Sequence, residues 1–236
     1  MNPDDRSLLV APHADATDML ERLLSTRWSC RAFRAQPVPR TDIERVVDIA
    51  RRTPSWCNVQ PWHLHITEAV ATDELRAALA AEIAAGPTPA PDIEFPSRYE
   101  GVYQDRRRAA GWQLYESLGI AKGDRAASTQ QTLRNFDFFD APHVAIVTTE
   151  AVLGTYGAVD CGLFVGNFLL SAHSLGIATI PQAALATQAP VIREFFGLPS
   201  ERHVLLGISF GYAVDGHPVN AYRTERQSVA DVVSFR

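Results

Sequence analysis

The sequence predicts an α+β domain, on three observations. Several segments carry apolar residues at helical spacing, and four or five short segments alternate as strands do or are rich in β-branched residues. Neither G-x-G-x-x-G nor G-x-x-x-x-G-K-[ST] occurs, so the usual dinucleotide and NTP loops are absent. The composition, 46% hydrophobic and 21% charged, is typical of a globular enzyme. The length of 236 residues permits one large domain or two small ones.

The N-terminal part of the chain predicts three helices and one strand. Residues 17–27 carry an apolar stripe at helical spacing. Thr41 and Glu44 have the spacing of a capping box at the start of a second amphipathic helix. Residues 63–67 alternate between polar and apolar side chains, which predicts a strand with one buried face. Thr72 is expected to cap a third helix that ends near residue 85.

The middle of the chain is proline-rich and then helical. Residues 86–96 contain too many prolines for either regular element, which predicts a loop. Helical stretches follow at about 102–120 and 126–138, and the apolar run 144–148 predicts a buried strand.

A long apolar helix dominates the C-terminal part. Residues 159–175 are apolar nearly all round, so the helix must be covered on every side, by its own chain or by a second subunit. Polar residues interrupt the uncharged run, which argues against a membrane span. Two strands are expected at 177–180 and 203–212, joined by a short helix near 189–196, and a last helix follows Thr224.

Charge and cysteine usage narrow the function classes. The net charge of −5 argues against a general nucleic-acid binder. Cys30, Cys57 and Cys161 form no CxxC pair, so no zinc site is expected and a reducing compartment is favoured. The first residues are acidic and lack an apolar signal core. A cytoplasmic protein without a metal site is therefore expected.

Two basic segments suggest an anion site. Arg27, Ser29 and Arg31 follow the first helix, and in extended chain they point the same way, as a phosphate monoester requires. Arg223 and Arg226 form a second basic pair near the C-terminus. Taken singly, each segment is better explained as solvated surface arginines. Lys122 is the only lysine among 22 basic residues, and most of this arginine excess fits a GC-rich genome.

Two further segments suggest a flat heterocycle. In residues 54–62 two prolines bracket Asn58 and Gln60, whose amides could donate and accept at a ring edge or could satisfy their own backbone. Residues 176–184 end a strand in small side chains, which permits close approach of a planar ligand or simply a tight turn.

In this order, the four segments resemble the FMN-dependent nitroreductase family. The first matches the family pattern Arg-x-Ser-x-Arg-x-Phe, and the second matches Pro-Ser-x-x-Asn-x-Gln-Pro-Trp. The third reads Gly-Ile-Ala-Thr-Ile-Pro-Gln-Ala-Ala, and the tail matches Pro-Val-Asn-x-x-Arg-Thr-x-Arg. The second pattern is the most specific. The resemblance covers about residues 17–235, which favours a single domain over residues 1–236.

The resemblance implies an α/β sandwich with a mainly antiparallel sheet, intertwined as a homodimer with FMN at the subunit interface. It assigns flavin contacts to Arg27, Trp28 (through its backbone), Ser29, Arg31, Arg223 and Arg226 at the phosphate and ribityl end, to Pro54, Ser55 and Asn58 of the partner subunit, and to Pro181, Gln182 and Ala183 beside the isoalloxazine.

The chemistry implied by the resemblance belongs to the flavin. NAD(P)H would deliver hydride to flavin N5, and a nitroaromatic or similar small aromatic or quinone oxidant would follow in a ping-pong cycle. No dedicated protein nucleophile or acid–base pair is expected.

The sequence departs from the family pattern at several positions. Trp28 stands where a basic residue or histidine is common, and Trp56 and Cys57 stand where small residues are usual, which bears on substrate size. Residues 86–138 fall where family members vary and are expected to roof the flavin. Substrate contacts are expected at Tyr99, Tyr103 and Phe138, whereas the run 106–108 is interpreted as a solvated helix face.

Other activities remain open on the same scaffold. Enone reduction, dehalogenation of aromatics and flavin breakdown use related flavin chemistry. A flavin-storage protein without turnover is an alternative of a different class.

Overall fold

The computed structural model describes residues 14–86 and 88–236, so the N-terminal stretch expected to lack a signal core lies largely outside them. Four strands form one antiparallel sheet in the order β1-β2-β4-β3. The strands are β1 (His63–Ile66), β2 (His143–Glu150), β3 (Ala178–Gln182) and β4 (Arg202–Gly211). The helices are α1 (Ala14–Thr26), α2 (Arg40–Ala50), α3 (Val70–Ala85), α4 (Gly101–Ser117), α5 (Arg125–Leu133), α6 (Gly154–Ser174), α7 (Ala189–Phe196) and α8 (Val229–Val232).

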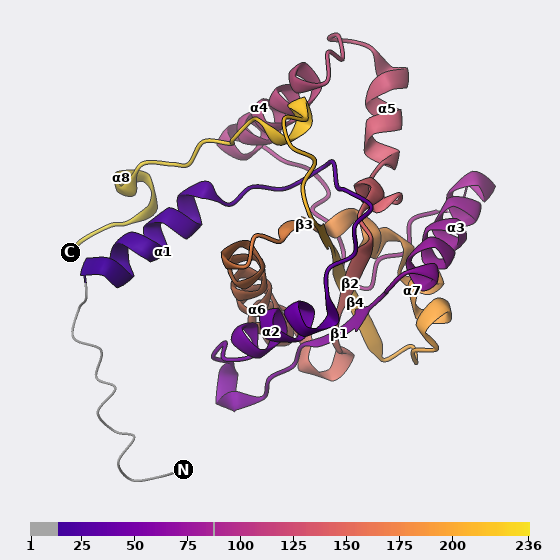
Figure 1. Cartoon of the computed structure of the whole chain (residues 1–236), viewed down its shortest axis with the longest axis horizontal. Coiled ribbons are helices and arrows are strands. Elements are labelled where there is room, and N and C mark those ends of the chain that lie inside the picture. Colours follow the sequence, from indigo (N-terminus) through magenta and orange to yellow (C-terminus); the bar gives the residue numbers. More distant parts are fainter. Residues whose placement is uncertain (1–13, 87) are drawn as a thin grey trace.

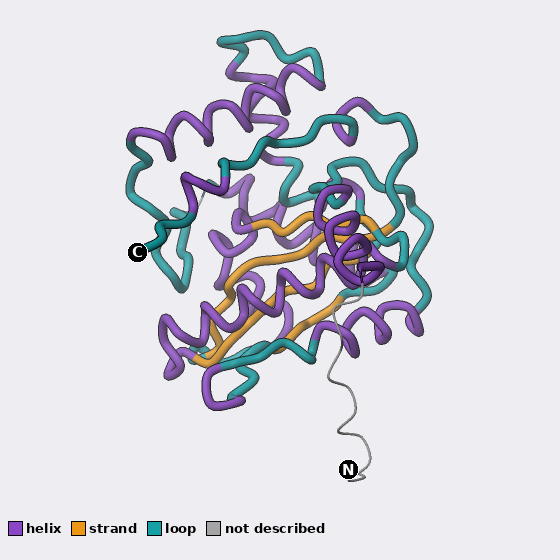
Figure 2. Tube along the Cα trace, turned by 90° about the vertical axis from the view of Figure 1, so that its left-hand side faces the viewer, coloured by secondary structure: helices purple, strands orange, loops and turns teal. Residues whose placement is uncertain are grey.

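The sheet is covered by helices on both faces (Figures 1 and 2). Side chains alternate along the central strand β2, so Val144 and Ile146 enter one apolar cluster and Ala145 and Val147 enter another. The first cluster lies under α3 and α7, and the second lies under α2 and α6. The expected α+β sandwich with a mainly antiparallel sheet is confirmed.

The long helix α6 packs against α2 and β2 with one side only. Its outward stripe leaves Tyr156, Val159 and Leu163 exposed in the single chain. Among the described residues, the segment Ala151–Ser174 is the one helix long and apolar enough to cross a membrane, judged by length and composition alone. The expectation that this helix is covered on every side is therefore not met within one chain.

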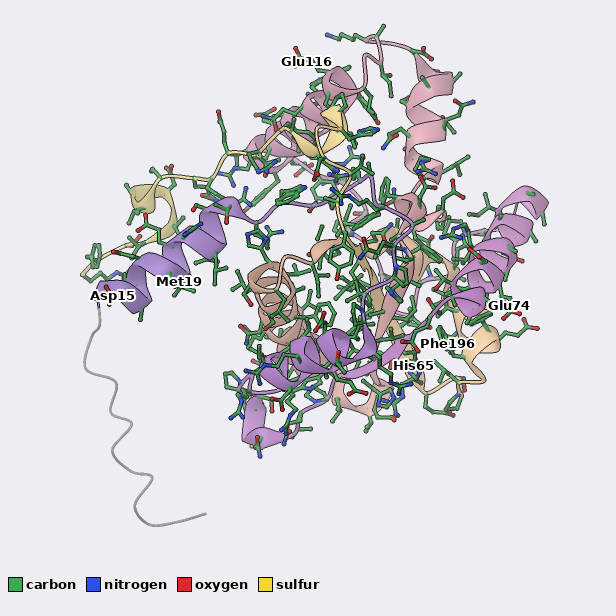
Figure 3. All side chains as sticks on the ribbon, viewed as in Figure 1. Asp15, Met19, His65, Glu74, Glu116 and Phe196 are labelled. Atoms are coloured by element: carbon green, nitrogen blue, oxygen red, sulfur yellow. The ribbon has the colours of Figure 1, made fainter. Side chains whose placement is uncertain are left out.

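The helix α1 carries the expected apolar stripe but does not bury it. Met19, Leu20 and Leu24 are each about half exposed, and Figure 3 shows Met19 on a helix that extends away from the sheet. The apolar face of α1 is thus left free in the single chain.

Helices α4 and α5 form an excursion at one end of the molecule (top of Figure 1) and contain no buried residue. The loop that leads into it is fixed to the body. Asp92 pairs with Arg193, with side chains only 10% and 18% exposed, and also accepts a bond of 2.7 Å from the Val204 amide.

Two sequence expectations about helix starts were wrong. Thr41 and Glu44 form no capping box, because α2 begins at Arg40 behind a proline, and the Glu44 carboxylate accepts a bond of 3.1 Å from Arg40 Nε instead. Thr72 lies inside α3, where its hydroxyl donates to the Pro142 carbonyl at 2.9 Å. A local arginine binds the Glu44 carboxylate, and a tertiary partner binds the Thr72 hydroxyl.

Candidate functional site

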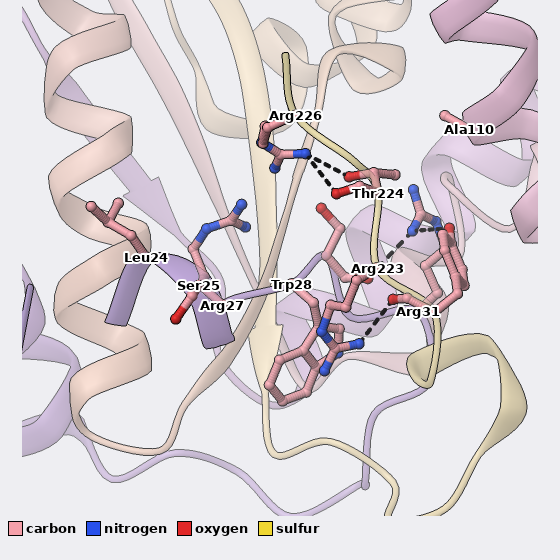
Figure 4. Close-up of a pocket in the computed structure, with 11 residues that line it drawn as sticks. Leu24, Ser25, Arg27, Trp28, Arg31, Ala110, Arg223, Thr224 and Arg226 are labelled. Carbon is pink, nitrogen blue, oxygen red and sulfur yellow. Dashed lines mark hydrogen bonds between the residues drawn. The ribbon is translucent and has the colours of Figure 1, made fainter. Parts of the chain in front are cut away.

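The two basic segments meet in one cavity of about 220 Å³ (Figure 4). Arg27 and Arg31 reach it from the chain segment after α1, and Arg223 and Arg226 reach it from the C-terminal tail. The remaining lining residues are Leu24, Ser25, Trp28, Ser29, Ala110, Tyr222 and Thr224. The structure therefore brings together all four arginines that the sequence singled out.

Backbone pairing holds the first segment beside β3. Ser29 forms an isolated parallel bridge with Thr179, and the Cys30 amide donates to the Thr179 carbonyl at 3.0 Å. This pairing places the arginine segment next to the strand that carries residues 181–183.

A buried asparagine joins the tail to this segment. Asn220 Oδ1 accepts a bond of 2.9 Å from the Arg31 amide, while its Nδ2 donates to the Ala32 carbonyl at 3.0 Å. The sequence analysis did not single out Asn220 or Tyr222 as site residues, although both lie in the tail motif. Polar side chains just before Arg223 were the available signal.

The cavity is strongly electropositive. Among the described residues, none of the four arginines forms an ion pair with a carboxylate. Burial, and then repulsion from Arg226, lowers the pKa of Arg27. Like charges gathered without counter-charges are what a phosphate-binding site provides.

Aromatic side chains hold two of the arginines in position. The Arg31 guanidinium donates to the Tyr222 hydroxyl at 2.8 Å, and the Arg223 guanidinium lies 4.7 Å from the centre of the Trp28 ring system. Beneath them, His173 contacts the Trp28 ring edge-on, and burial and the nearby Arg27 and Arg223 lower its pKa. The histidine therefore adds no positive charge near neutral pH.

At the end of β3, Gln182 offers a ligand its backbone and not its side chain. Gln182 is buried, its Oε1 accepts a hydrogen bond from the Ser209 hydroxyl, and its Nε2 donates to the Asn135 carbonyl at 2.8 Å. Pro181 and Ala183 on either side are not fully buried. A planar ligand at this strand end would meet backbone groups and small side chains.

The loop of residues 54–60 is exposed and rigid. Cys57 and Asn58 both have positive φ, of 48° and 57°, and Ser55 Oγ accepts a bond of 2.9 Å from the Gln60 amide. The Trp56 amide donates to Asp160 on α6 at 3.0 Å. Pro54 and Asn58 face solvent, so the Asn58 side chain is available to a ligand outside this chain.

This loop lies far from the arginine cavity of the same chain. It is tied to α6 at Asp160, whereas the segment of Arg27 is tied to α6 at His173, which bonds Thr26 Oγ1 at 2.8 Å. Thirteen residues of helix separate these ties, or about 20 Å at 1.5 Å per residue. The structure does not bring the loop and the arginines of one chain together.

One expected substrate contact was wrong. Phe138 has no exposed surface and packs in the core, with the Arg76 guanidinium 5.4 Å from its ring centre. α5 ends at Leu133 and not at residue 138, and the chain turns sharply at Phe138 and Phe139, with φ of 57° and 52°. Tyr99 and Tyr103, by contrast, are exposed on the excursion.

Comparison with known proteins places the chain in a family. The model of the nitroreductase family matches residues 24–212. The chain is 34% identical to nitroreductase NfnB of Mycolicibacterium smegmatis over 97% of each chain, and 33% identical to a 4-nitrobenzoate reductase of Pseudomonas putida over 93% of this chain and 96% of that one.

Comparison with solved structures gives the same family. The crystal structure of the FMN-dependent nitroreductase NfnB from Mycobacterium smegmatis in complex with NADPH superposes with a TM-score of 0.89. It is 33% identical, and the match covers 94% of this chain and all of that one. On its motifs, its fold and these matches, the chain belongs to the nitroreductase family.

Proposed function

We propose that this protein is an FMN-dependent NAD(P)H oxidoreductase that reduces nitroaromatic compounds. The observation that carries the proposal is the arginine cavity: four guanidinium groups from both ends of the chain converge there, and among the described residues none of them has a carboxylate partner. The family membership and the nitroreductases among the relatives support it.

The residues present fit FMN. The cavity is suited to a phosphate monoester because Arg27, Arg31, Arg223 and Arg226 offer charge-assisted bonds and Ser29 offers a hydroxyl. The neighbouring strand end at residues 181–183 offers backbone and small side chains to a planar ring. When bound, FMN supplies the electron transfer between NAD(P)H and the oxidant.

The chain's own residues bind and orient. The arginines hold the phosphate end, and Trp28 and Tyr222 keep two of those arginines in place through the contacts described above. We propose that Tyr99 and Tyr103 contact aromatic molecules that enter from the side of the excursion. The excursion would also shield the flavin ring from water.

The site is proposed to be completed by a second copy of the chain. Since the loop of Pro54, Ser55 and Asn58 is tied to α6 about 20 Å from its own arginines, it serves a flavin held mainly by the other subunit. The exposed apolar stripe of α6 supports this homodimer. Three free cysteines, Cys30, Cys57 and Cys161, support a reducing compartment such as the cytoplasm.

An anaerobic spectrum tests the function. The purified protein is expected to be yellow, to lose its visible absorbance when NADPH or NADH is added, and to regain it when 4-nitrobenzoate follows. Free FMN at the same concentration is the control for uncatalysed bleaching. A flavin-containing protein that fails to bleach would instead be a flavin-binding or storage protein.

A further inference from the structure

Nine arginines of the described residues form ion pairs with acids, whereas three consecutive arginines on α4 form none. Ion pairs are made by Arg34, Arg40, Arg45, Arg51, Arg76, Arg98, Arg134, Arg193 and Arg202. Within residues 14–86 and 88–236, the consecutive Arg106, Arg107 and Arg108 of α4 make none, and all three are exposed. This run is a local excess of positive charge in a chain of net charge −5.

Two of these arginines lie on the side of α4 that contacts the arginine cavity. Ala110 lines that cavity, and α4 packs against the tail at Pro218–Asn220. Arg106 and Arg107 precede Ala110 by four and three residues, which puts them on its face of the helix at about 5–6 Å spacing. Arg108 is two residues away, rotated by about 200° to the opposite face.

At the start of α4, this face meets a hollow lined by aromatic side chains. A hollow of about 510 Å³ is lined by residues 98–103, including Tyr99 and Tyr103. Tyr103 is 67% exposed and lies one turn before Arg106 and Arg107. The Arg107 guanidinium already lies over the Tyr99 ring, 5.4 Å from its centre, which restrains it near the hollow.

These features follow one another along one helix. From Gly101 to Ala110 the helix axis covers about 14 Å, running from an aromatic hollow, past two unpaired guanidinium groups, to the cavity assigned to the flavin phosphate. An adenosine that carries a ribose phosphate requires an aromatic side chain beside two neighbouring arginines. The adenine ring stacks on the aromatic side chain, and the phosphate accepts bidentate bonds from the arginines.

We propose that Arg106 and Arg107 bind the 2′-phosphate of NADPH, with the adenine stacked on Tyr103, and so select NADPH over NADH. This inference rests on the proposed function and specifies its co-substrate. A phosphate monoester carries nearly two negative charges at neutral pH, whereas a nitrobenzoate carboxylate carries one. The guanidinium groups of Arg106 and Arg107 therefore fit the phosphate better than they fit the oxidant.

Steady-state kinetics test the selection. In the double variant R106A/R107A the KM for NADPH is expected to rise about tenfold, the scale of one lost hydrogen bond to a charged group. The KM for NADH and for 4-nitrobenzoate should change less than about twofold. R108A is the matched control, because it removes the same charge from the opposite face and should leave the KM for NADPH unchanged.

Binding without turnover gives a second readout. With the protein saturated in FMN, so that the flavin-phosphate cavity is filled, calorimetry should show adenosine 2′,5′-bisphosphate binding more tightly than 5′-AMP. The double variant should lose that difference, and R108A should keep it. Wild-type protein that binds the bisphosphate in this way but oxidises neither dinucleotide would contradict the proposed function and leave this site standing.

Three results would overturn the inference. Equal KM changes for NADPH and NADH would indicate a general charge effect. A rise confined to 4-nitrobenzoate would assign the arginines to the oxidant. Equal behaviour of R108A and the double variant would show that the helix face does not matter.

Discussion

At the scale of residues, the arginine cavity depends on neutral partners more than on acids. Tyr222 and Trp28 hold Arg31 and Arg223 through a hydroxyl and an aromatic face, and neither adds negative charge. Repulsion within the cluster is therefore left uncompensated, and together with the larger effect of burial it lowers the pKa of Arg27. A bound dianion relieves this repulsion, so binding and local stability are coupled.

The contribution of one arginine can be measured cleanly at Arg226. Its side-chain hydrogen bonds within residues 14–86 and 88–236 go to Thr224 and the Glu225 carbonyl, two exposed neighbours, so Arg226→Ala should leave the fold intact. FMN binding should weaken by about 1.5–3 kcal/mol, the value of a hydrogen bond to a charged group, as read from a flavin fluorescence titration. Arg125→Ala, on exposed α5, is the control. Undiminished FMN affinity in Arg226→Ala would remove this residue from the phosphate site.

At the scale of elements, His65 links the edge strand β1 to β2 and α7. Its Nε2 lies 3.2 Å from Thr148 Oγ1, and its ring lies 5.2 Å from that of Phe196, a pair labelled in Figure 3. Burial, with smaller effects of His63 and Arg202, lowers the pKa of His65 to about 4. The folded chain therefore keeps this histidine neutral where the unfolded chain protonates it.

The consequence is a defined pH dependence of stability. Between about pH 6.5 and pH 4 the unfolded state binds more protons at His65, so the free energy of unfolding should fall as the pH falls through this window. Urea unfolding of wild type and His65→Gln at several pH values measures it, and the variant should show a shallower slope. Identical slopes would mean that His65 does not titrate differently in the two states.

At the scale of the whole molecule, one chain leaves the apolar stripe of α6 and the Asn58 side chain exposed. The outward stripe of α6 exposes Val159 and Leu163, with Gly162 and Gly166 beside them. A Cβ atom at either glycine would meet nothing within 4 Å in this chain, so the room is there for a second helix to approach closely. The proposed homodimer would bury this stripe and bring the loop of Asn58 to the other subunit's flavin.

A charge in this stripe should break the assembly. Leu163, 51% exposed, lies on the stripe, so Leu163→Glu would bury a carboxylate in the proposed interface. The variant should sediment as a monomer and lose FMN, because both subunits complete each site. Val70→Glu, an equally drastic change at an exposed position on α3, should do neither. A dimeric, flavin-loaded Leu163→Glu protein would contradict this arrangement.

The sequence by itself determined the elements and the chemistry of the motifs. Apolar periodicity located α7 at residues 189–196 and the strand at 203–212 to within a residue, because local spacing decides which face is buried. Within each segment, the motif arginines likewise suggested anion binding. These features depend on neighbours within a few residues along the chain.

Only the tertiary structure decided which side chains are free to act. Gln182 looked available from its motif, but Ser209 and Asn135 bind its amide inside the protein. Phe138 looked like a surface aromatic, but three successive residues of positive φ turn it into the core. The arginines became one site because Asn220 joins the tail to Arg31, 189 residues away, while the bridge between Ser29 and Thr179 holds that segment beside β3. Such contacts are long-range, and no local pattern specifies them.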